Sequence, residues 1–200
     1  RAVYDLPPSE PRPASLSMPT VFGAPDVLLL DLPQLREDQA AHRPFVAAHA
    51  KPWPGEIAVY RSAATEGFAL LTTFSSRARM GVLATDFFAG PVSRIDLANA
   101  LVVDLYSGTL ESVTDITLLG GANALAVETG SGQWEIVQAG VAELIAPGRY
   151  RLTRLLRGQR GTEGAMVSMV PTGTRVVVLD TAVVPLPISE ADLGLPWNWR

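Results

Sequence analysis

The sequence has 200 residues, of which 48% are hydrophobic and 18% charged, a composition typical of a folded globular chain and not of a disordered one. Its formal net charge of −4 gives no basic surface for nucleic acid or for an anionic membrane. The lack of cysteine excludes disulfides, thiolate metal sites and cysteine nucleophiles. No apolar run reaches the roughly 18–20 residues of a membrane-spanning helix, so we expect neither a nucleic-acid partner nor membrane insertion.

Residues 1–24 are predicted to be a lead-in strand at Ala2–Leu6, followed by a proline-rich linker. Four prolines within the seven residues from Pro7 to Pro13 remove backbone donors and favour an extended chain. The stretch lacks an initiator methionine and the apolar core of a signal peptide. We therefore expect the chain to be a domain that follows another one in a longer polypeptide.

The first half of the chain alternates between short apolar runs and turn residues. Val27–Leu32 is an apolar run between two prolines and predicts a buried strand. Gln34–His42 is polar enough for one or two exposed helical turns, and small residues at Phe45–Ala50 lead into a stiff Pro-Trp-Pro-Gly turn. Residues 56–74 contain two alternating runs on either side of Glu66-Gly67, which predicts a β-hairpin.

The second half contains further short β candidates, separated by glycines. Leu110–Leu119 fits either a strand pair or a short helix, because its periodicity favours neither. Arg175–Leu179 is apolar on both faces and predicts a strand buried on both sides. The other candidates are Met80–Ala84, Ile95–Leu97, Leu101–Tyr106 and Ala124–Glu128.

The clearest local pattern is a hairpin that leads into a loop rich in arginine and glycine, between Gln133 and Gly164. In its first strand Trp134 and Ile136 share one face, with Glu135 and Val137 on the other. A Pro147-Gly148 pair suits the centre of a type II turn. In the second strand the apolar positions Tyr150 and Leu152 alternate with the polar positions Arg149, Arg151 and Thr153.

These patterns predict a mostly β fold, sandwich-like or barrel-like, with many short strands and little helix. We expect one β-rich domain over residues 25–184, either as a single body or as two small subdomains divided near residues 90–100. Residues 185–200 begin with prolines and predict an irregular tail toward a following domain.

The loop Arg157–Gly164, called the signature loop below, does not fit a phosphate-binding loop. It has no lysine, its glycine spacing differs from that of a P-loop, and the residues after it predict a strand instead of a helix. Its arginines are better suited to charge-assisted hydrogen bonds with carbonyls or carboxylates, with Glu163 as a partner in the same loop.

The sequence offers no pattern typical of a catalytic or metal site. His42 and His49 are seven residues apart with a proline between them, so they do not form the i, i+4 pair of a helical metal site. There is no G-x-S-x-G motif and no carboxylate pair in a distinctive context. We expect no enzymatic activity, no cofactor and no metal. Trp134 is expected in the core, while Trp53, Trp197 and Trp199 are candidate exposed aromatics for stacking on a glycan.

Residues 149–163 read RYRLTRLLRGQRGTE and, together with the preceding Gly148, match a G-x-Y-x-L-x-x-L-L-R-G-x-R-G-T-E segment. In this the chain resembles the phage-type tail proteins, specifically the C-terminal part of the baseplate hub or host-specificity ("megatron") protein of gene transfer agents and related siphophages. The resemblance covers roughly residues 20–200 and is supported by Pro52–Gly55, Gly81, Gly120–Ala124, Gln133–Ile136 and Val184–Pro187.

The resemblance implies a structural component of a virion tail tip, made in the bacterial cytoplasm, that assembles with other tail and baseplate proteins. It implies a homotrimer in the full-length particle and supplies no catalytic residues for these positions. Two alternatives remain: a receptor-binding or glycan-binding module that contacts the host surface, and a cell-wall hydrolase domain. The residues predicted to form the structural and assembly loop are Arg149, Arg151, Arg154, Arg157, Gly158, Arg160, Gly161 and Glu163.

Overall fold

The computed structural model describes residues 20–130 and 132–200, and these residues confirm the mostly β prediction. Six strands close into a barrel in the order β10-β7-β5-β12-β8-β9. Two three-stranded sheets, β1-β2-β13 and β14-β3-β4, and a two-stranded ribbon, β11-β6, complete the fold. The strands are β1 (Asp26–Leu30), β2 (Phe45–His49), β3 (Ile57–Ser62), β4 (Ala69–Phe74), β5 (Met80–Leu83), β6 (Phe87–Phe88), β7 (Leu101–Leu105), β8 (Ala124–Gly130), β9 (Gln133–Ala146), β10 (Arg149–Leu156), β11 (Met169–Val170), β12 (Arg175–Val178), β13 (Val184–Pro185) and β14 (Asn198–Trp199).

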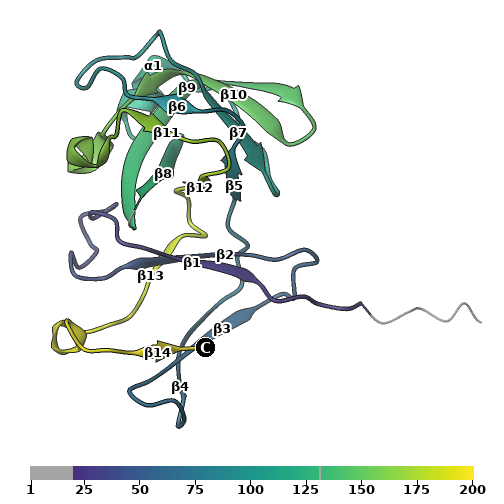
Figure 1. Cartoon of the computed structure of the whole chain (residues 1–200), viewed down its shortest axis with the longest axis vertical. Helices are drawn as coiled ribbons and strands as arrows, with labels where there is room; N and C mark the ends of the chain where they lie inside the picture. The colour runs from purple at the N-terminus through teal and green to yellow at the C-terminus, as the bar shows by residue number, and fades with distance from the viewer. Residues whose placement is uncertain (1–19, 131) are drawn as a thin grey trace, which may run out of the picture.

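The molecule is built in layers along its long axis (Figure 1). The barrel lies at one end, the β1-β2-β13 sheet crosses the middle, and the β14-β3-β4 sheet lies at the other end. The chain enters the barrel after β4 and leaves it after β12. At this crossing the guanidinium of Arg79 donates to the carboxylate of Asp180 at 2.8 Å, which ties the entering and leaving segments together.

The position of β2 between two layers explains why most of its side chains are small. Phe45 and Ala47 pack toward the barrel in a cluster that includes Trp134, whereas Val46 and Ala48 pack toward the outer sheet. All five residues of β2 are buried, so bulky side chains on both faces would force the layers apart. From the sequence alone, Phe45–Ala50 can be described only as a segment of small residues. Its strand is recognised only in the structure, where β2 pairs with β1 and β13.

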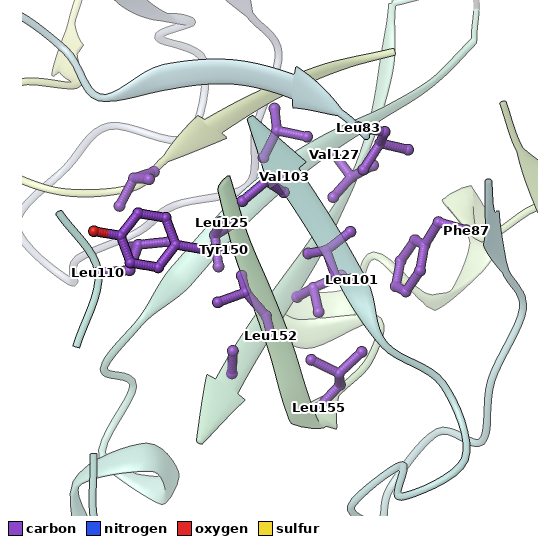
Figure 2. Packing of buried hydrophobic residues seen from close by; sticks show 14 of the residues in the cluster. Leu83, Phe87, Leu101, Val103, Leu110, Leu125, Val127, Tyr150, Leu152 and Leu155 are labelled. Atoms are coloured by element: carbon purple, nitrogen blue, oxygen red, sulfur yellow. The ribbon is translucent and has the colours of Figure 1, made fainter. Parts of the chain in front are cut away.

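The barrel interior is filled by apolar side chains from all six strands. Figure 2 shows these side chains pointing toward one another from several strands, with Phe87 and Tyr150 at opposite sides of the cluster. The interior is close-packed, which is how a barrel of this size is stabilised. Its buried members include Leu83, Leu101, Val103, Leu125, Val127, Val137, Leu152, Leu155, Val176 and Val178.

Helical structure is confined to one short helix and three 3-10 turns in the described residues: α1 (Asp115–Leu119), η1 (Gln159–Gly161), η2 (Glu163–Ala165) and η3 (Glu190–Asp192). The Thr114 side chain caps α1 by accepting from the backbone N–H of Thr117, and Leu118 anchors the helix in the interior. The helix alternative for Leu110–Leu119 is thus confirmed for its second half, while residues 110–114 are irregular.

Several local predictions differ from the structure. Gln34–His42 forms turns and no helix, and Oε1 of Gln39 accepts the backbone N–H groups of Leu35 and Arg36 within these turns. Strand β1 is buried on one face only, since Val27 and Leu29 are exposed.

The predicted divisions of the chain also differ from the observed layers. Residues 90–100 lie between β6 and β7 within the barrel half, and Ile95–Leu97 contributes only a bridge between Asp96 and Leu155. Residues 185–200 are irregular apart from the end of β13, η3 and β14, and β14 pairs with β3 through Asn198 and Trp199. The predicted lead-in strand Ala2–Leu6 lies outside the described residues.

Candidate functional site

The alternation of inward and outward side chains in β10 is interrupted near Arg154, and this interruption directs the Arg157 side chain into the interior. Tyr150 and Leu152 face inward as predicted, but the next inward residue is Leu155 and not Arg154. Arg154 has a φ of 57°, in the left-handed region, and lies against Gly140, where an added Cβ would be 3.3 Å from the Cβ of Arg154. The shift from even to odd positions places the Arg157 side chain, two residues after Leu155, beneath the end of the barrel.

Arg157 is only 2% exposed, and its guanidinium is surrounded by partners. Nε and one terminal nitrogen donate to the two carboxylate oxygens of Glu135 at 2.7 and 2.9 Å, a bidentate pair. The other terminal nitrogen donates to the carbonyl of Phe88 at 2.8 Å. The guanidinium carbon lies 4.0 Å from the centre of the Phe87 ring, a cation–π contact.

A second buried carboxylate, Asp96, lies 3.6 Å from the Arg157 guanidinium. Its oxygens also accept from the Asn99 side chain at 2.7 Å and from the backbone N–H groups of Ala98 and Asn99. Burial alone would raise the pKa of Asp96, but these hydrogen bonds and the charge of Arg157 outweigh burial, so its pKa is lowered. We call Arg157, Glu135 and Asp96 the Arg157 cluster.

The signature loop is held to the barrel by its own backbone and by Thr162. The N–H of Gly158 donates to Glu135 at 3.2 Å, so the same carboxylate binds both side chain and backbone. The Thr162 hydroxyl accepts from the backbone N–H of Ile136 at 2.9 Å and donates to the carbonyl of Gln159 at 2.7 Å. Gly158 has a φ of 59° and packs directly against Glu163.

The other predicted arginines divide into paired and unpaired groups. Arg149 forms a bidentate pair with Asp104 across β7 and β10, which lowers the pKa of Asp104. Arg154 donates to Asp115 at the start of α1 at 2.6 Å. Arg151 and Arg160 are exposed and form no ion pair with any residue between 20 and 200 that the structure describes.

Glu163 is not the partner of the loop arginines, contrary to the expectation from the sequence. It is exposed, with its Cα and Cγ against Gly158, and the buried partners are Glu135 and Asp96 from elsewhere in the barrel. The sequence carries one signal for this: Glu135 falls on the same face as the buried Val137, and a carboxylate at an inward position requires a cationic partner. No comparable signal marks Asp96.

The candidate aromatics lie in different settings. Trp53 is half-buried on the outer core cluster and donates from its ring N–H to the carbonyl of Ser75 at 3.0 Å. The half-buried Trp197 has the Arg61 guanidinium 4.3 Å from its ring centre. Trp199 is 38% exposed and borders a mostly apolar groove of about 340 Å³ between the two small sheets.

The Arg157 cluster is arranged to hold the loop and not to bind a substrate. Both carboxylates are buried and bind the same guanidinium, so neither faces a cavity. Within the described residues no group of three His, Asp or Glu side chains has the arrangement of a metal site. His42 and His49 lie apart: one contacts the carbonyl of Ile188, and the other is buried against the Tyr106 ring.

The family model described as Rcc01698-like, C-terminal matches residues 78–177. The chain belongs to this family. The Rcc01698-like match begins two residues before β5 and ends within β12, so the family segment coincides with the barrel and contains the whole Arg157 cluster.

The Rcc01698-like family is associated with gene transfer agent proteins, which confirms the expected link to that class of particle. Comparison with curated proteins finds no match. None of the helices in the described residues has the length and apolar character needed to cross a membrane.

Proposed function

We propose that this chain is a structural module of the tail tip or baseplate of a phage or gene-transfer-agent particle. It acts through protein–protein contacts with other tail and baseplate proteins, and as a homotrimer in the full-length protein. The observation that carries the proposal is that the family segment forms a barrel whose signature arginine serves the fold itself. The contact surface must then come from exposed side chains.

The β6–β11 ribbon provides such a surface. Phe88 and Met169 are cross-strand partners and are 54% and 43% exposed. The ribbon forms its own two-stranded sheet, adjacent to the Arg157 cluster through the Phe88 carbonyl. Phe and Met are among the residue types enriched at protein–protein interfaces. Burial of the pair against a neighbouring subunit would remove its apolar surface from water and stabilise the assembly.

The test uses the full-length gene in a bacterium that produces the particle. The double variant Phe88→Ser, Met169→Ser is expected to fold with an unchanged thermal midpoint, because both side chains are exposed, and to reduce the number of complete particles seen by electron microscopy. Leu70→Ser, on the exposed face of β4 outside the family segment, serves as the matched control. Assembly at wild-type level in the double variant would contradict the ribbon as a contact.

The glycan-binding alternative rests on Trp199 and its groove. The structural proposal expects no binding on a glycan array, whereas binding that is lost in Trp199→Ala would favour the alternative. The hydrolase alternative requires two carboxylates in one cleft. The apolar groove beside Trp199 is lined by none, and the pocket described below by Asp180 alone.

A further inference from the structure

A pocket of about 260 Å³ lies between the signature loop, the loop at residues 35–39 and the outer wall of the barrel. Ala124 of β8 and Ile136 of β9 form its floor, and the segment after β12 closes one side. The pocket therefore joins the family segment to residues that precede it. It is separate from the Arg157 cluster, whose three residues are buried and do not line it.

Two arginines line this pocket from different loops, Arg36 and Arg160. Both side chains are exposed, and neither forms an ion pair with any residue that the structure describes. Asp180 is the one carboxylate in the lining, and it already binds Arg79 at 2.8 Å. Glu37 and Asp38 follow Arg36 in sequence but do not line the pocket. The pocket thus holds two arginines without an ion-pair partner among the described residues, beside one carboxylate that already binds Arg79.

The backbone at both arginines is fixed, although the side chains are exposed. Arg160 has a φ of 61°, in the left-handed region that non-glycine residues rarely adopt. The Thr162–Gln159 bonds hold the turn in which it lies. On the opposite side, Oε1 of Gln39 accepts the N–H of Arg36 at 3.0 Å. Fixed backbones limit the conformational entropy that binding must overcome.

The rest of the lining defines the kind of ligand. Gln138 uses both amide hydrogens on the carbonyls of Leu118 and Ala122, and Gln159 donates to the carbonyl of Arg157. The guanidiniums are therefore the charged donors that remain available, and a guanidinium can bind a planar carboxylate through two parallel hydrogen bonds. No aromatic side chain lines the pocket for sugar stacking. Its volume lies below the roughly 300–1,000 Å³ of pockets that enclose larger organic ligands.

We propose that this pocket receives a carboxylate side chain from an acidic segment of a neighbouring protein, bound between Arg36 and Arg160. The inference rests on the proposed function, because it assumes that the domain works by protein–protein contact, and it names the chemistry of one such contact. Binding links the loop at residues 35–39 to the signature loop, so a partner would brace the barrel against the middle layer.

The experiment uses the whole 200-residue chain labelled with ¹⁵N and the blocked peptide acetyl-Glu-Glu-Glu-amide as the probe. Saturable shifts of the Arg36 and Arg160 side-chain Nε–H signals are expected, with none from acetyl-Gln-Gln-Gln-amide. Arg36→Gln and Arg160→Gln should each weaken binding about tenfold, as expected for loss of a charge-assisted pair. Arg151→Gln removes an exposed arginine from another face of the barrel and should leave binding unchanged.

Equal shifts with both peptides, or wild-type affinity in both pocket variants, would overturn the proposal. Binding of an oligogalacturonate in place of the glutamate peptide would also overturn it and assign the pocket to an acidic glycan. These outcomes are independent of the particle-assembly test. If the ribbon variant blocks assembly while the peptide fails to bind, the structural function stands and only the pocket assignment falls.

Discussion

Arg157, which the sequence assigns to a structural and assembly loop, is buried in the fold and holds that loop from inside. Its positive charge is buried and balanced by Glu135 and Asp96, and every polar arm of the guanidinium contacts an acceptor. Burying such a group costs desolvation energy that only good geometry recovers. The energetic consequence appears when one partner is removed, because the remaining charges then lie unpaired in the interior.

Arg157→Met is therefore expected to lower the free energy of unfolding by about 3–5 kcal/mol, since it leaves two buried carboxylates without their cation. Urea denaturation followed by circular dichroism measures the loss. Arg151→Met, at an exposed position of β10, should change the free energy by less than about 0.5 kcal/mol. A loss below about 1 kcal/mol at Arg157 would show that the cluster does not hold the loop.

His49 makes the stability of the fold depend on pH, in a range above that in which the aspartates titrate. Its ring is buried against Tyr106, and burial, with the nearby charge of Arg77, lowers its pKa below 6.5. The folded protein thus binds fewer protons than the unfolded chain below about pH 6.5. Stability is complete above that pH and falls as the solution is acidified toward the folded-state pKa. Thermal midpoints between pH 7.5 and 5 should show this decline.

The decline should flatten in His49→Gln, which cannot titrate, and persist in His42→Gln. Aspartates with lowered pKa values, such as Asp96 and Asp104, lose their stabilising effect only as the pH falls below about 3.8, so they do not contribute in this range. If the decline disappears in His42→Gln and persists in His49→Gln, the pH dependence does not come from His49 and the prediction is wrong.

At the scale of elements, the β9–β10 hairpin was predictable because its information is local. Alternating side chains and the Pro147-Gly148 turn specify the strands and the inward facing of Tyr150 and Leu152. The reversal at Arg154 was not predictable, because it depends on Gly140 across the hairpin and on α1 above it. Alternation continued without a break would place Arg157 outside, where the sequence suggests a contact with a partner.

The signature loop offers three glycines with different environments for a graded test. An added Cβ at Gly158 would lie 2.8 Å from Cγ and 2.9 Å from Cα of Glu163, in a residue with a φ of 59°. Gly161 has a φ of 80° but open space, and Gly164 has open space without a positive φ. Substitution by alanine should therefore destabilise most at Gly158, by about 1–2 kcal/mol at Gly161, and negligibly at Gly164.

Thermal unfolding of the three variants measures the order. An expected loss of about 2–4 kcal/mol at Gly158 combines backbone strain with the contact against Glu163, whose Cα belongs to the backbone and cannot rotate away. Equal losses at Gly158 and Gly161 would mean that strain alone matters and that the loop packs loosely.

At the scale of the molecule, the sequence predicts strands but not which strands meet. Barrel closure depends on pairings between distant segments, such as β5 with β12, and the partner of Arg157 includes Asp96, far away in the chain. A two-residue strand such as β14 has too few residues for a periodic signal. The limits of the barrel are likewise not evident in the sequence, because the middle layer takes its strands from both ends of the chain.

The layers share side chains, and this predicts that they unfold together. Trp134 projects from the outside of the barrel into a cluster with Phe45 and Ala47 of β2, whose other face packs on the outer sheet. Trp134→Ala should remove about 3–5 kcal/mol, because it leaves a cavity between layers. In a cooperative molecule the slowest-exchanging amides of β7 and of β3 should lose the same amount of protection in native-state hydrogen exchange.

The control variant Trp199→Ala, at an exposed position, should leave the protection of both strands unchanged. If β3 keeps its protection while β7 loses it, the outer layer is a separate folding unit, and the barrel alone is the domain that the family segment defines.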